Sequence, residues 1–336
     1  MRAYQLPQAT GIDALTKVDL PMPKPAHRQV LVKVAACSLN FRDLAIALNR
    51  YRAAVKPNLV PLSDGAGEVI EVGSGVTRVK PGDRVASCFF QRWVGGLPSA
   101  DTQPSALGGS VDGMLAEYVV LEDEGLVKLP SHLSYEEGAA LPCAAVTAWH
   151  ALVEHGRLIG GQTVLIQGTG GVSIFALQFA RLMGAQVIAT SSSDTKLARA
   201  KALGAAQGIN YKTTPEWEKA VLDLTGGHGV DQVVEVGGAG TLAKSLSCVR
   251  IGGKVSMIGV LTGAAEINPM LIMARRANVQ GISVGSMQMF EAMNRAIAVA
   301  GLKPVIDKVF AFDETPAAYR YLQSAAHFGK VIIRLA

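Results

Sequence analysis

Clustered glycines at Gly168, Gly170 and Gly171 are the residues of this sequence best suited to hold a phosphate. The apolar run Thr163 to Gln167 precedes them, and from Val172 onward apolar residues recur at the spacing of a helix. A helix that begins at glycines presents free backbone N–H groups and the positive end of its dipole, which favour a pyrophosphate. The pattern predicts a dinucleotide-binding turn at this cluster of glycines.

The kind of nucleotide depends on the charge at the end of the next strand. An NAD site usually has Asp or Glu there, about 20 residues past the first glycine, to accept from the ribose 2′-hydroxyl. This chain has Ser191 and Ser192, with Lys196 one helical turn further on. Hydroxyls and a cation suit a 2′-phosphate, whereas Asp194 falls in the first turn of a helix, where the dipole favours it. These residues predict NADPH as the cofactor.

The glycine fingerprint is imperfect, because Ser173 stands where the third glycine of G-x-G-x-x-G belongs. Whether this turn belongs to a dinucleotide-binding unit must therefore be judged from the elements around it. Further strand patterns span 184–190, 208–211, 231–236 and 254–260, and helical patterns span 194–203, 215–224 and a segment from 241. Alternating strands and helices predict an α/β fold with a doubly wound parallel sheet of the Rossmann type.

The residues before this sheet follow a different pattern. Alternating segments such as 29–35 and 67–72, separated by Gly/Pro turns, predict a β-rich N-terminal domain. After the sheet come a predicted helix around 290–299 and a strand over 330–334, which we expect to return to that first domain. The predicted domains are 1–144, completed by 285–336, and 145–284. A ligand cleft between them is expected, because sites favour domain interfaces.

Composition narrows the function classes. The chain has 336 residues, of which 49% are hydrophobic and 18% charged, with a net charge of +5 and no basic run. These values argue against nucleic-acid binding. No stretch of about 18 apolar residues or signal-peptide core is present, so we expect no membrane span and a cytoplasmic location. The four cysteines are dispersed, which predicts neither a disulfide framework nor a metal clip.

Several motifs resemble one known family along essentially the whole chain. They are Leu39-Asn-Phe-Arg-Asp43, Ser63-Asp-Gly-Ala-Gly-Glu-Val69, Val79-Lys-Pro-Gly-Asp-Arg-Val85, Leu141-Pro-Cys-Ala-Ala-Val-Thr-Ala-Trp149, the Gly168 turn and His327-Phe-Gly-Lys-Val-Ile-Ile333. In this order they resemble the medium-chain dehydrogenase/reductase superfamily, and its quinone oxidoreductase and enoyl reductase branch more than the zinc alcohol dehydrogenases. The resemblance implies a GroES-like N-terminal domain.

The resemblance also raises the question of zinc. The positions that match the Cys, His and Cys ligands of zinc alcohol dehydrogenases are Asn40, Ser63 and Cys143. Neutral Asn and Ser cannot replace a thiolate and an imidazole as zinc donors. Cys88 is the only cysteine between 38 and 142, so the structural zinc lobe of that family is missing as well. We therefore expect no bound metal.

Without a Lewis acid, the more accessible chemistry is hydride addition to an electron-poor acceptor, either a quinone or an α,β-unsaturated carbonyl compound. Such a reaction needs a hydrogen-bond donor for the developing enolate. Asn40 or Tyr51 is expected to bind the carbonyl oxygen, and Arg42, Ser63 and Asp64 are further candidate catalytic residues by motif position. For Arg42 and Asp64 the alternative is a structural ion pair. The proton donor is left open, and water is one candidate.

The resemblance implies more cofactor contacts. The matching positions are Gly170, Gly171 and Val172 at the pyrophosphate turn, Thr147 near the nicotinamide, Tyr211 near the adenosine phosphate, Gly259 and Val260 at the end of the fifth strand, Ser283 and Val284 at the end of the sixth, and Lys330 at the pyrophosphate. Lys330 precedes an apolar strand, where packing offers it no evident role. Relatives pair through the sixth strand, over 279–284 here, so a homodimer is expected.

Two other readings stay open. The first is an alcohol dehydrogenase-like enzyme acting on alcohols or aldehydes, and the second is a non-enzymatic NADPH-binding protein like the lens crystallins that resemble this branch. The region 89–115, rich in Gly, Pro and Ser, is expected to line the substrate entrance. Its only charges are Arg92, Asp101 and Asp112, which favours a neutral or apolar small-molecule substrate.

Overall fold

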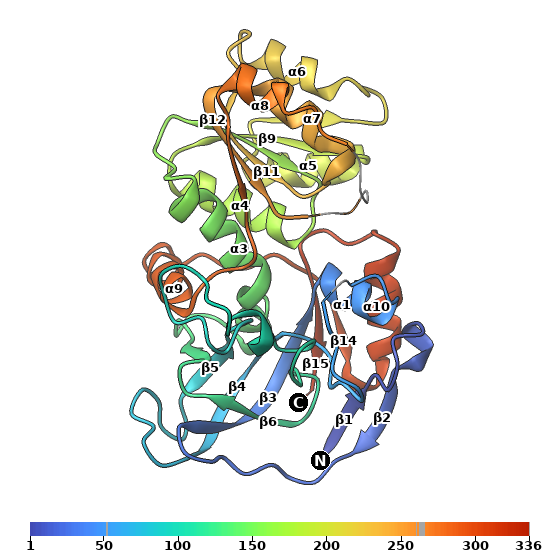
Figure 1. Ribbon diagram of the computed structural model, residues 1–336, viewed down its shortest axis with the longest axis vertical. Coiled ribbons are helices and arrows are strands. Elements are labelled where there is room, and N and C mark those ends of the chain that lie inside the picture. Colours follow the sequence, from blue (N-terminus) through green and yellow to red (C-terminus); the bar gives the residue numbers. More distant parts are fainter. Residues whose placement is uncertain (52, 260, 262–265, 336) are drawn as a thin grey trace. The chain divides into compact units, whose positions relative to one another are not determined.

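The structure is a computed structural model that describes residues 1–51, 53–259, 261 and 266–335. It divides into two compact units (Figure 1). Unit 1 comprises Met1–Val146 and Val284–Ala336, and unit 2 comprises Thr147–Ser283. Unit 2 is therefore inserted into the chain of unit 1. The predicted boundaries fall one or two residues from these positions.

Unit 2 contains a six-stranded sheet in the order β10-β9-β8-β11-β12-β13, and every pairing is parallel. Its strands are β8 (Thr163–Gln167), β9 (Gln186–Ser191), β10 (Gln207–Asn210), β11 (Val230–Glu235), β12 (Val249–Met257) and β13 (Asn278–Gly281). Numbered within the unit, this is the order 3-2-1-4-5-6 of a Rossmann sheet. The predicted α/β fold class is confirmed.

Helices cover the sheet of unit 2, and the inner strands β8, β9 and β11 carry its buried apolar residues, whereas the edge strands β10 and β13 are more polar. The helices are α4 (Gly171–Leu182), α5 (Asp194–Ala202), α6 (Trp217–Leu224), α7 (Ala239–Cys248), α8 (Met270–Arg275) and the π-helical segment His150–His155, which the short helix α3 (Val146–Trp149) precedes. Helices α4 and α5 pack on β8, β9 and β10, whereas α7 and α8 pack on β12. Leu165, Ile188 and Val233 lie fully buried in the core between these layers.

Two strand predictions in unit 2 missed their bounds. β12 begins at Val249 rather than near Lys254, because Gly252 and Gly253 inside it mask the strand pattern. β13 ends at Gly281 and does not reach Val284, which has a left-handed φ of +52° and leaves the extended conformation.

Unit 1 is β-rich, as predicted. Its strands are β1 (Arg2–Gln5), β2 (Thr16–Asp19), β3 (Gln29–Leu39), β4 (Asp64–Val72), β5 (Arg84–Ser87), β6 (Tyr118–Glu122), β7 (Leu126–Lys128), β14 (Ile306–Ala311) and β15 (Lys330–Arg334). The main sheet has the order β14-β15-β3-β4-β5-β7, with β6 also paired to β3. β15 therefore lies beside β3 although it comes near the end of the sequence (Figure 1).

Unit 1 has few helices, and they flank its sheet. They are α1 (Phe41–Ala47), α2 (Tyr135–Ala139), α9 (Met287–Ala300), α10 (Thr315–Gln323), the π-helical segment Leu141–Ala145, and short 3-10 turns at Ile12–Ala14, Gln103–Ser105 and Phe312–Glu314. The core joins Val32 and Leu39 of β3 with Leu115 and Ile333. Since β3 ends at Leu39 and α1 begins at Phe41, the residue between them is fixed at both sides.

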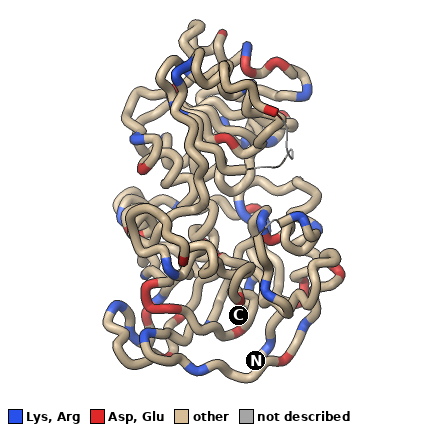
Figure 2. Tube along the Cα trace, in the orientation of Figure 1, with Lys and Arg blue, Asp and Glu red and all other residues tan. Residues whose placement is uncertain are grey.

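Basic residues (Lys and Arg) and acidic residues (Asp and Glu) are interspersed along the Cα trace of each unit (Figure 2). Across the described ranges, none of the helices combines the length and the apolar character needed to cross a bilayer.

Candidate functional site

The glycine turn of unit 2 has the predicted strand–turn–helix form. Gly168 follows β8 with a φ of +69°, a conformation that glycine adopts without strain. A Cβ atom there would meet nothing within 4 Å, so open space lies over the turn. Helix α4 then begins at Gly171, and its N-cap Gly170 offers no capping side chain. The first N–H groups of α4, those of Gly171 and Val172 among them, therefore suit the pyrophosphate of a dinucleotide.

Ser173 occupies the third-glycine position without disturbing the turn. Its side chain is buried, and its hydroxyl donates to the Gln167 carbonyl at 2.6 Å. The hydroxyl thus joins the first turn of α4 to the end of β8, which agrees with a small side chain being tolerated here.

A buried polar network lies beneath the turn, and the sequence analysis did not find it. The Glu235 carboxylate, fully buried at the end of β11, accepts from Gln167 Nε2 at 2.7 Å and from the backbone N–H groups of Gly237 and Gly238, each at 2.9 Å. The hydroxyls of Thr241 and Ser245 also donate to it. The sequence did carry a signal for this network, because the polar residues Gln167 and Glu235 each end an apolar strand.

The residues proposed to select the nucleotide gather where β9 and β10 end. Ser191 is buried, its hydroxyl accepts from Ser193 N at 3.3 Å, and its carbonyl accepts from Tyr211 N at 3.0 Å. Ser192 follows it and is half-buried, while Tyr211 is 42% exposed.

Helix α5 begins at Asp194, in agreement with the assignment of that residue to a first helical turn. The Ser193 hydroxyl accepts from Lys196 N at 3.4 Å and caps the helix. The Asp194 carboxylate accepts from the Asn210 side chain at 2.9 Å. Asp194 is therefore already hydrogen-bonded to the end of β10.

The other residues expected to contact the cofactor differ in burial and in their place relative to the strands. Gly259 must be glycine, because a Cβ atom would come within 1.9 Å of the Val236 carbonyl oxygen. Val260 lies outside the described residues. Ser283 is exposed and Val284 is buried, and both lie beyond the end of β13. Thr147 is buried in α3.

In unit 1, Asp64 is the centre of a second buried polar cluster. Its carboxylate is fully buried at the start of β4 and accepts from the Ser63 hydroxyl at 2.7 Å and from Cys143 N at 3.1 Å. The Lys330 ammonium lies 3.9 Å from Asp64 Oδ2. Burial raises the pKa of Asp64, and Lys330, the Asn40 amide, Ser63 and the Cys143 N–H oppose that rise.

Lys330 belongs to this cluster. No packing role was expected for this residue from the sequence, and that expectation was wrong. Its side chain is 3% exposed, and its Nζ donates to the Leu39 carbonyl at 2.9 Å and to Asn40 Oδ1 at 2.6 Å. The first residue of β15 lies beside the end of β3, which brings the ammonium to these oxygens.

Asn40 is held between β3 and α1. Its backbone N–H donates to Asp43 Oδ2 at 2.8 Å across the first turn of α1, and its side-chain oxygen accepts from Lys330. Asp43 is buried as well, and burial is the main reason that its pKa rises to about 7. The negative charge of Asp64 adds to the rise, whereas Arg42, the Asn40 N–H and Lys330 oppose it.

Arg42 does not pair with Asp64, which overturns the ion-pair alternative. The Arg42 Nη1 donates to the Leu107 carbonyl at 2.6 Å, and its guanidinium carbon lies 4.5 Å from the ring centre of Phe89 and 5.2 Å from that of Tyr51. The guanidinium is thus held by two aromatic rings and a loop carbonyl. Tyr51 is half-buried beside it.

The donor set in unit 1 does not fit a catalytic zinc ion. Asn40 and Ser63 are neutral, and burial strongly raises the pKa of the Cys143 thiol, which disfavours a thiolate. The Lys330 ammonium on Asn40 would also repel a dication. Elsewhere in the described part of the chain, no three His, Cys, Asp or Glu side chains gather as a metal site.

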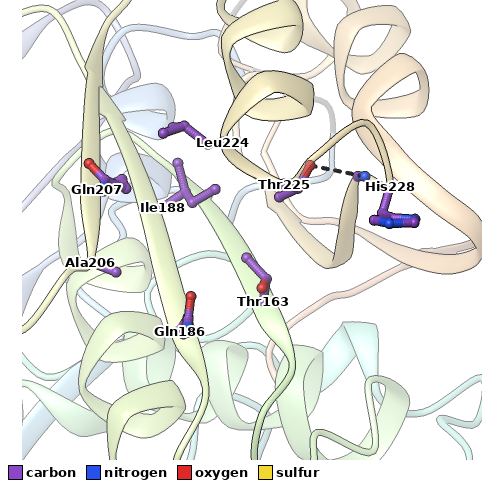
Figure 3. Close-up of a pocket in the computed structure, with 9 residues that line it drawn as sticks. Thr163, Gln186, Ile188, Ala206, Gln207, Leu224, Thr225 and His228 are labelled. Atoms are coloured by element: carbon purple, nitrogen blue, oxygen red, sulfur yellow. Dashed lines mark hydrogen bonds between the residues drawn. The ribbon is translucent and has the colours of Figure 1, made fainter.

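A hollow of about 280 Å³ in unit 2 is not part of the candidate site. Thr163, Gln186 and Gln207 line it at the amino ends of β8, β9 and β10 (Figure 3). The glycine turn lies at the opposite, carboxyl end of β8. Ligands of open parallel sheets bind at the carboxyl ends.

Comparisons with known proteins agree with this architecture. Residues 26–131 match the alcohol dehydrogenase GroES-like domain family, and residues 171–299 match the zinc-binding dehydrogenase family. A zinc-type alcohol dehydrogenase-like protein of Schizosaccharomyces pombe is 44% identical over 98% of this chain and 97% of its own length. A quinone oxidoreductase of Rattus norvegicus is 30% identical over 100% of this chain and 98% of its own.

A solved structure is similar over its whole length. A putative alcohol dehydrogenase from Sinorhizobium meliloti matches with a TM-score of 0.93 and 41% identity, covering 99% of this chain and 98% of that one.

Proposed function

Because the chain belongs to the medium-chain dehydrogenase/reductase superfamily of oxidoreductases, we propose that it is an NADPH-dependent reductase of quinones or α,β-unsaturated carbonyl compounds that works without zinc. The observation that carries the proposal is the buried cluster of Asn40, Asp64 and Lys330. Asn40 stands at a position that matches a zinc ligand and accepts from the Lys330 ammonium, which supports a site that binds an oxygen by hydrogen bonds rather than by a metal. The quinone oxidoreductase among the relatives supports the same chemistry.

The acceptor is reduced by adding one hydride and one proton across a conjugated system. The bound nucleotide would supply the hydride to the electron-poor carbon, and the displaced electron pair would move to the carbonyl oxygen. That oxygen needs a hydrogen-bond donor already in place as its charge develops. In this chain the Asn40 NH₂ group and the Tyr51 hydroxyl are the proposed donors, and a proton from water completes the product.

The preference for NADPH rests on the end of β9. Ser191, Ser192 and Lys196 are the groups proposed to receive the 2′-phosphate. The Asp194 carboxylate, which would repel that phosphate, accepts from Asn210 instead. This arrangement supports a cationic rather than an acidic ribose site.

A neutral or apolar acceptor is proposed because two of the three charges between Phe89 and Leu115 are paired with neighbouring residues. Arg92 lies 2.9 Å from Glu122, and Asp112 lies 3.0 Å from Lys56. A charged acceptor would find little uncompensated charge in this region.

A homodimer is proposed through β13, which ends the unit 2 sheet on one side. An edge strand presents backbone groups that can pair with the same strand of a second copy. Light scattering at several protein concentrations measures the mass of the assembly and tests this proposal.

The proposed function is tested by following NADPH oxidation with a panel of quinones, enones and 2-alkenals. Turnover of at least one class, by protein purified without added metal and free of stoichiometric zinc in elemental analysis, is the expected result. Stoichiometric zinc together with alcohol oxidation would favour the alcohol dehydrogenase reading. Tight NADPH binding with no turnover of any class would favour a non-enzymatic role. Equal or better kcat/KM with NADH would overturn the nucleotide preference.

A further inference from the structure

Lys330 is buried in a way that needs explanation. Taking an ammonium out of water is costly unless its protons find acceptors. The three N–H groups of Lys330 face two oxygens at hydrogen-bond distance, those of Leu39 and Asn40, and the Asp64 carboxylate at 3.9 Å. The charge is therefore compensated within unit 1, and the contacts fix where the ammonium lies.

The same contacts fix the Asn40 side chain. An amide can present either its oxygen or its NH₂ group to a neighbour, and the hydrogen-bond network decides which. Because an ammonium can only donate, the Asn40 oxygen must face Lys330, so the NH₂ group faces away from it. The Asn40 backbone is held too, through its N–H bond to Asp43.

The NH₂ group of Asn40 is the part of this residue left unmatched. Asn40 is 9% exposed, and its Nδ2 lies near enough to the Asp64 carboxylate to lower the pKa of that group, yet it makes no hydrogen bond of full geometry with any described residue. A buried donor without an acceptor costs free energy, and in native proteins such a group is commonly explained by an ordered water, an ion or a catalytic role. A carbonyl oxygen that becomes negative during the reaction is the acceptor that such a donor suits.

We infer that Lys330 is a positioning residue of the acceptor site, whose ammonium holds the Asn40 oxygen so that the Asn40 NH₂ group donates to the acceptor's carbonyl oxygen. The inference rests on the proposed function, in which that oxygen becomes an enolate or hydroquinone oxygen. An amide whose oxygen accepts from a cation is polarised, which strengthens its N–H donors. The buried positive charge thus acts on the acceptor through one amide.

This assignment differs from a pyrophosphate contact in what it predicts. If Lys330 bound the pyrophosphate, its loss would weaken NADPH binding and spare turnover at saturating cofactor. If Lys330 acts through Asn40, its loss lowers kcat and leaves the NADPH dissociation constant unchanged.

The experiment compares K330M, N40A, the double variant and the control K308M, since Lys308 is an exposed lysine on the adjacent strand β14. NADPH binding is followed by fluorescence, and turnover with the best acceptor of the panel. We expect K330M and N40A each to lower kcat at least about tenfold, NADPH affinity to stay within about twofold, and the double variant to be no worse than N40A. Multiplying effects, or a tenfold weaker NADPH affinity with unchanged kcat, would overturn the inference.

N40D keeps the test decisive if K330M does not fold. The new carboxylate still accepts from Lys330 but lacks the NH₂ donor. The added carboxylate lies beside Asp43 and Asp64, so N40D is expected to melt below the wild-type temperature and, at temperatures where it is folded, to lose kcat about tenfold or more. Wild-type kcat in N40D would remove the role of the NH₂ group.

A binding measurement separates this inference from the proposed function. In the presence of NADP⁺, 4-nitrophenolate serves as an anionic mimic of the enolate, and its absorbance reports binding without turnover. Affinity at least about fivefold weaker in K330M and N40D than in wild type and K308M is expected, even if no acceptor of the panel is reduced. Equal affinity in all four proteins would refute the positioning role, whatever the panel shows.

Discussion

Gln167 and Glu235 end two neighbouring parallel strands, β8 and β11, and the Gln167 amide donates to the buried Glu235 carboxylate at 2.7 Å. Gln167 is also the last residue before the Gly168 turn. The base of the turn is therefore tied to the loop that follows β11, where Gly237 and Gly238 donate to the same carboxylate.

Removing this carboxylate is expected to destabilise unit 2. In E235A, the Ser245 hydroxyl and the Gly238 N–H would lose their acceptor, at a cost of about 1–3 kcal/mol for each unsatisfied group, whereas Gln167 Nε2 keeps the Ser245 oxygen and the Gly237 N–H keeps Gln167 Oε1. We expect a loss of at least about 3 kcal/mol in urea unfolding. The exposed control D223A should change stability by less than about 0.5 kcal/mol. Equal midpoints for E235A and wild type would contradict the prediction.

The Gly168 turn is expected to bind phosphate through its backbone. Gly161 precedes β8 with a φ of +84°, and Gly168 follows β8 with a φ of +69°. Alanine at either position would be strained by about 1–2 kcal/mol. In both places a Cβ atom would enter open space. Only G168A should weaken NADPH affinity, by about tenfold or more, because its methyl group occupies the space over the turn. Parallel losses of affinity in G168A and G161A would show that the turn is not the phosphate site.

The cation on α5 should distinguish the two nucleotides. K196E replaces a proposed 2′-phosphate partner with a repelling charge, so the dissociation constant for NADPH should rise about 10- to 100-fold while that for NADH stays unchanged. K201E, on the last turn of the same helix, is the charge-matched control. Titration of both nucleotides by fluorescence checks this. If NADH and NADPH weakened together, Lys196 would have no specific phosphate contact.

Asp43 should make stability depend on pH. Its pKa in the folded protein is about 7, above the ordinary value of 3.8, so between these values the folded chain holds a proton that the unfolded chain releases. The contribution is therefore present at low pH and is lost as pH rises through about 7, with a slope of at most about 1.4 kcal/mol per pH unit.

D43N should flatten this dependence. Between pH 5 and pH 8 its free energy of unfolding should fall by less than that of the wild type. Urea midpoints measured from pH 5 to pH 8 provide the test. The raised pKa of Asp64 acts in the same direction and leaves some dependence in the variant. An unchanged slope in D43N would mean that Asp43 does not titrate in this range.

The sequence predicted the features that depend on near neighbours. The turn at Gly168, the helix start at Asp194 and the final strand at Lys330 follow from local patterns of glycine, capping and apolar residues, and they were found where expected. The superfamily followed from motifs read in order.

Contacts between distant residues could not be predicted in this way. Lys330 finds its partner Asn40 at a separation of 290 residues, and Gln167 finds Glu235 at a separation of 68. Only the strand order brings them together. For Arg42, two aromatic rings and the Leu107 carbonyl were stronger local competitors than the carboxylate of Asp64, and a one-dimensional pattern does not show such competition.

The pairing of β15 with β3 sets an order of assembly during synthesis on the ribosome. Unit 2 is one continuous segment, so all of it has been translated before β15 emerges. The polar cluster of unit 1 must wait for Lys330, and until then Asn40 and Asp64 lack their cation. Long-range strand pairing of this kind is slow to form. A nascent chain stalled before residue 330 would therefore carry a complete unit 2 and an incomplete polar cluster in unit 1, and the proposed binding of NADPH would arise earlier than the proposed turnover.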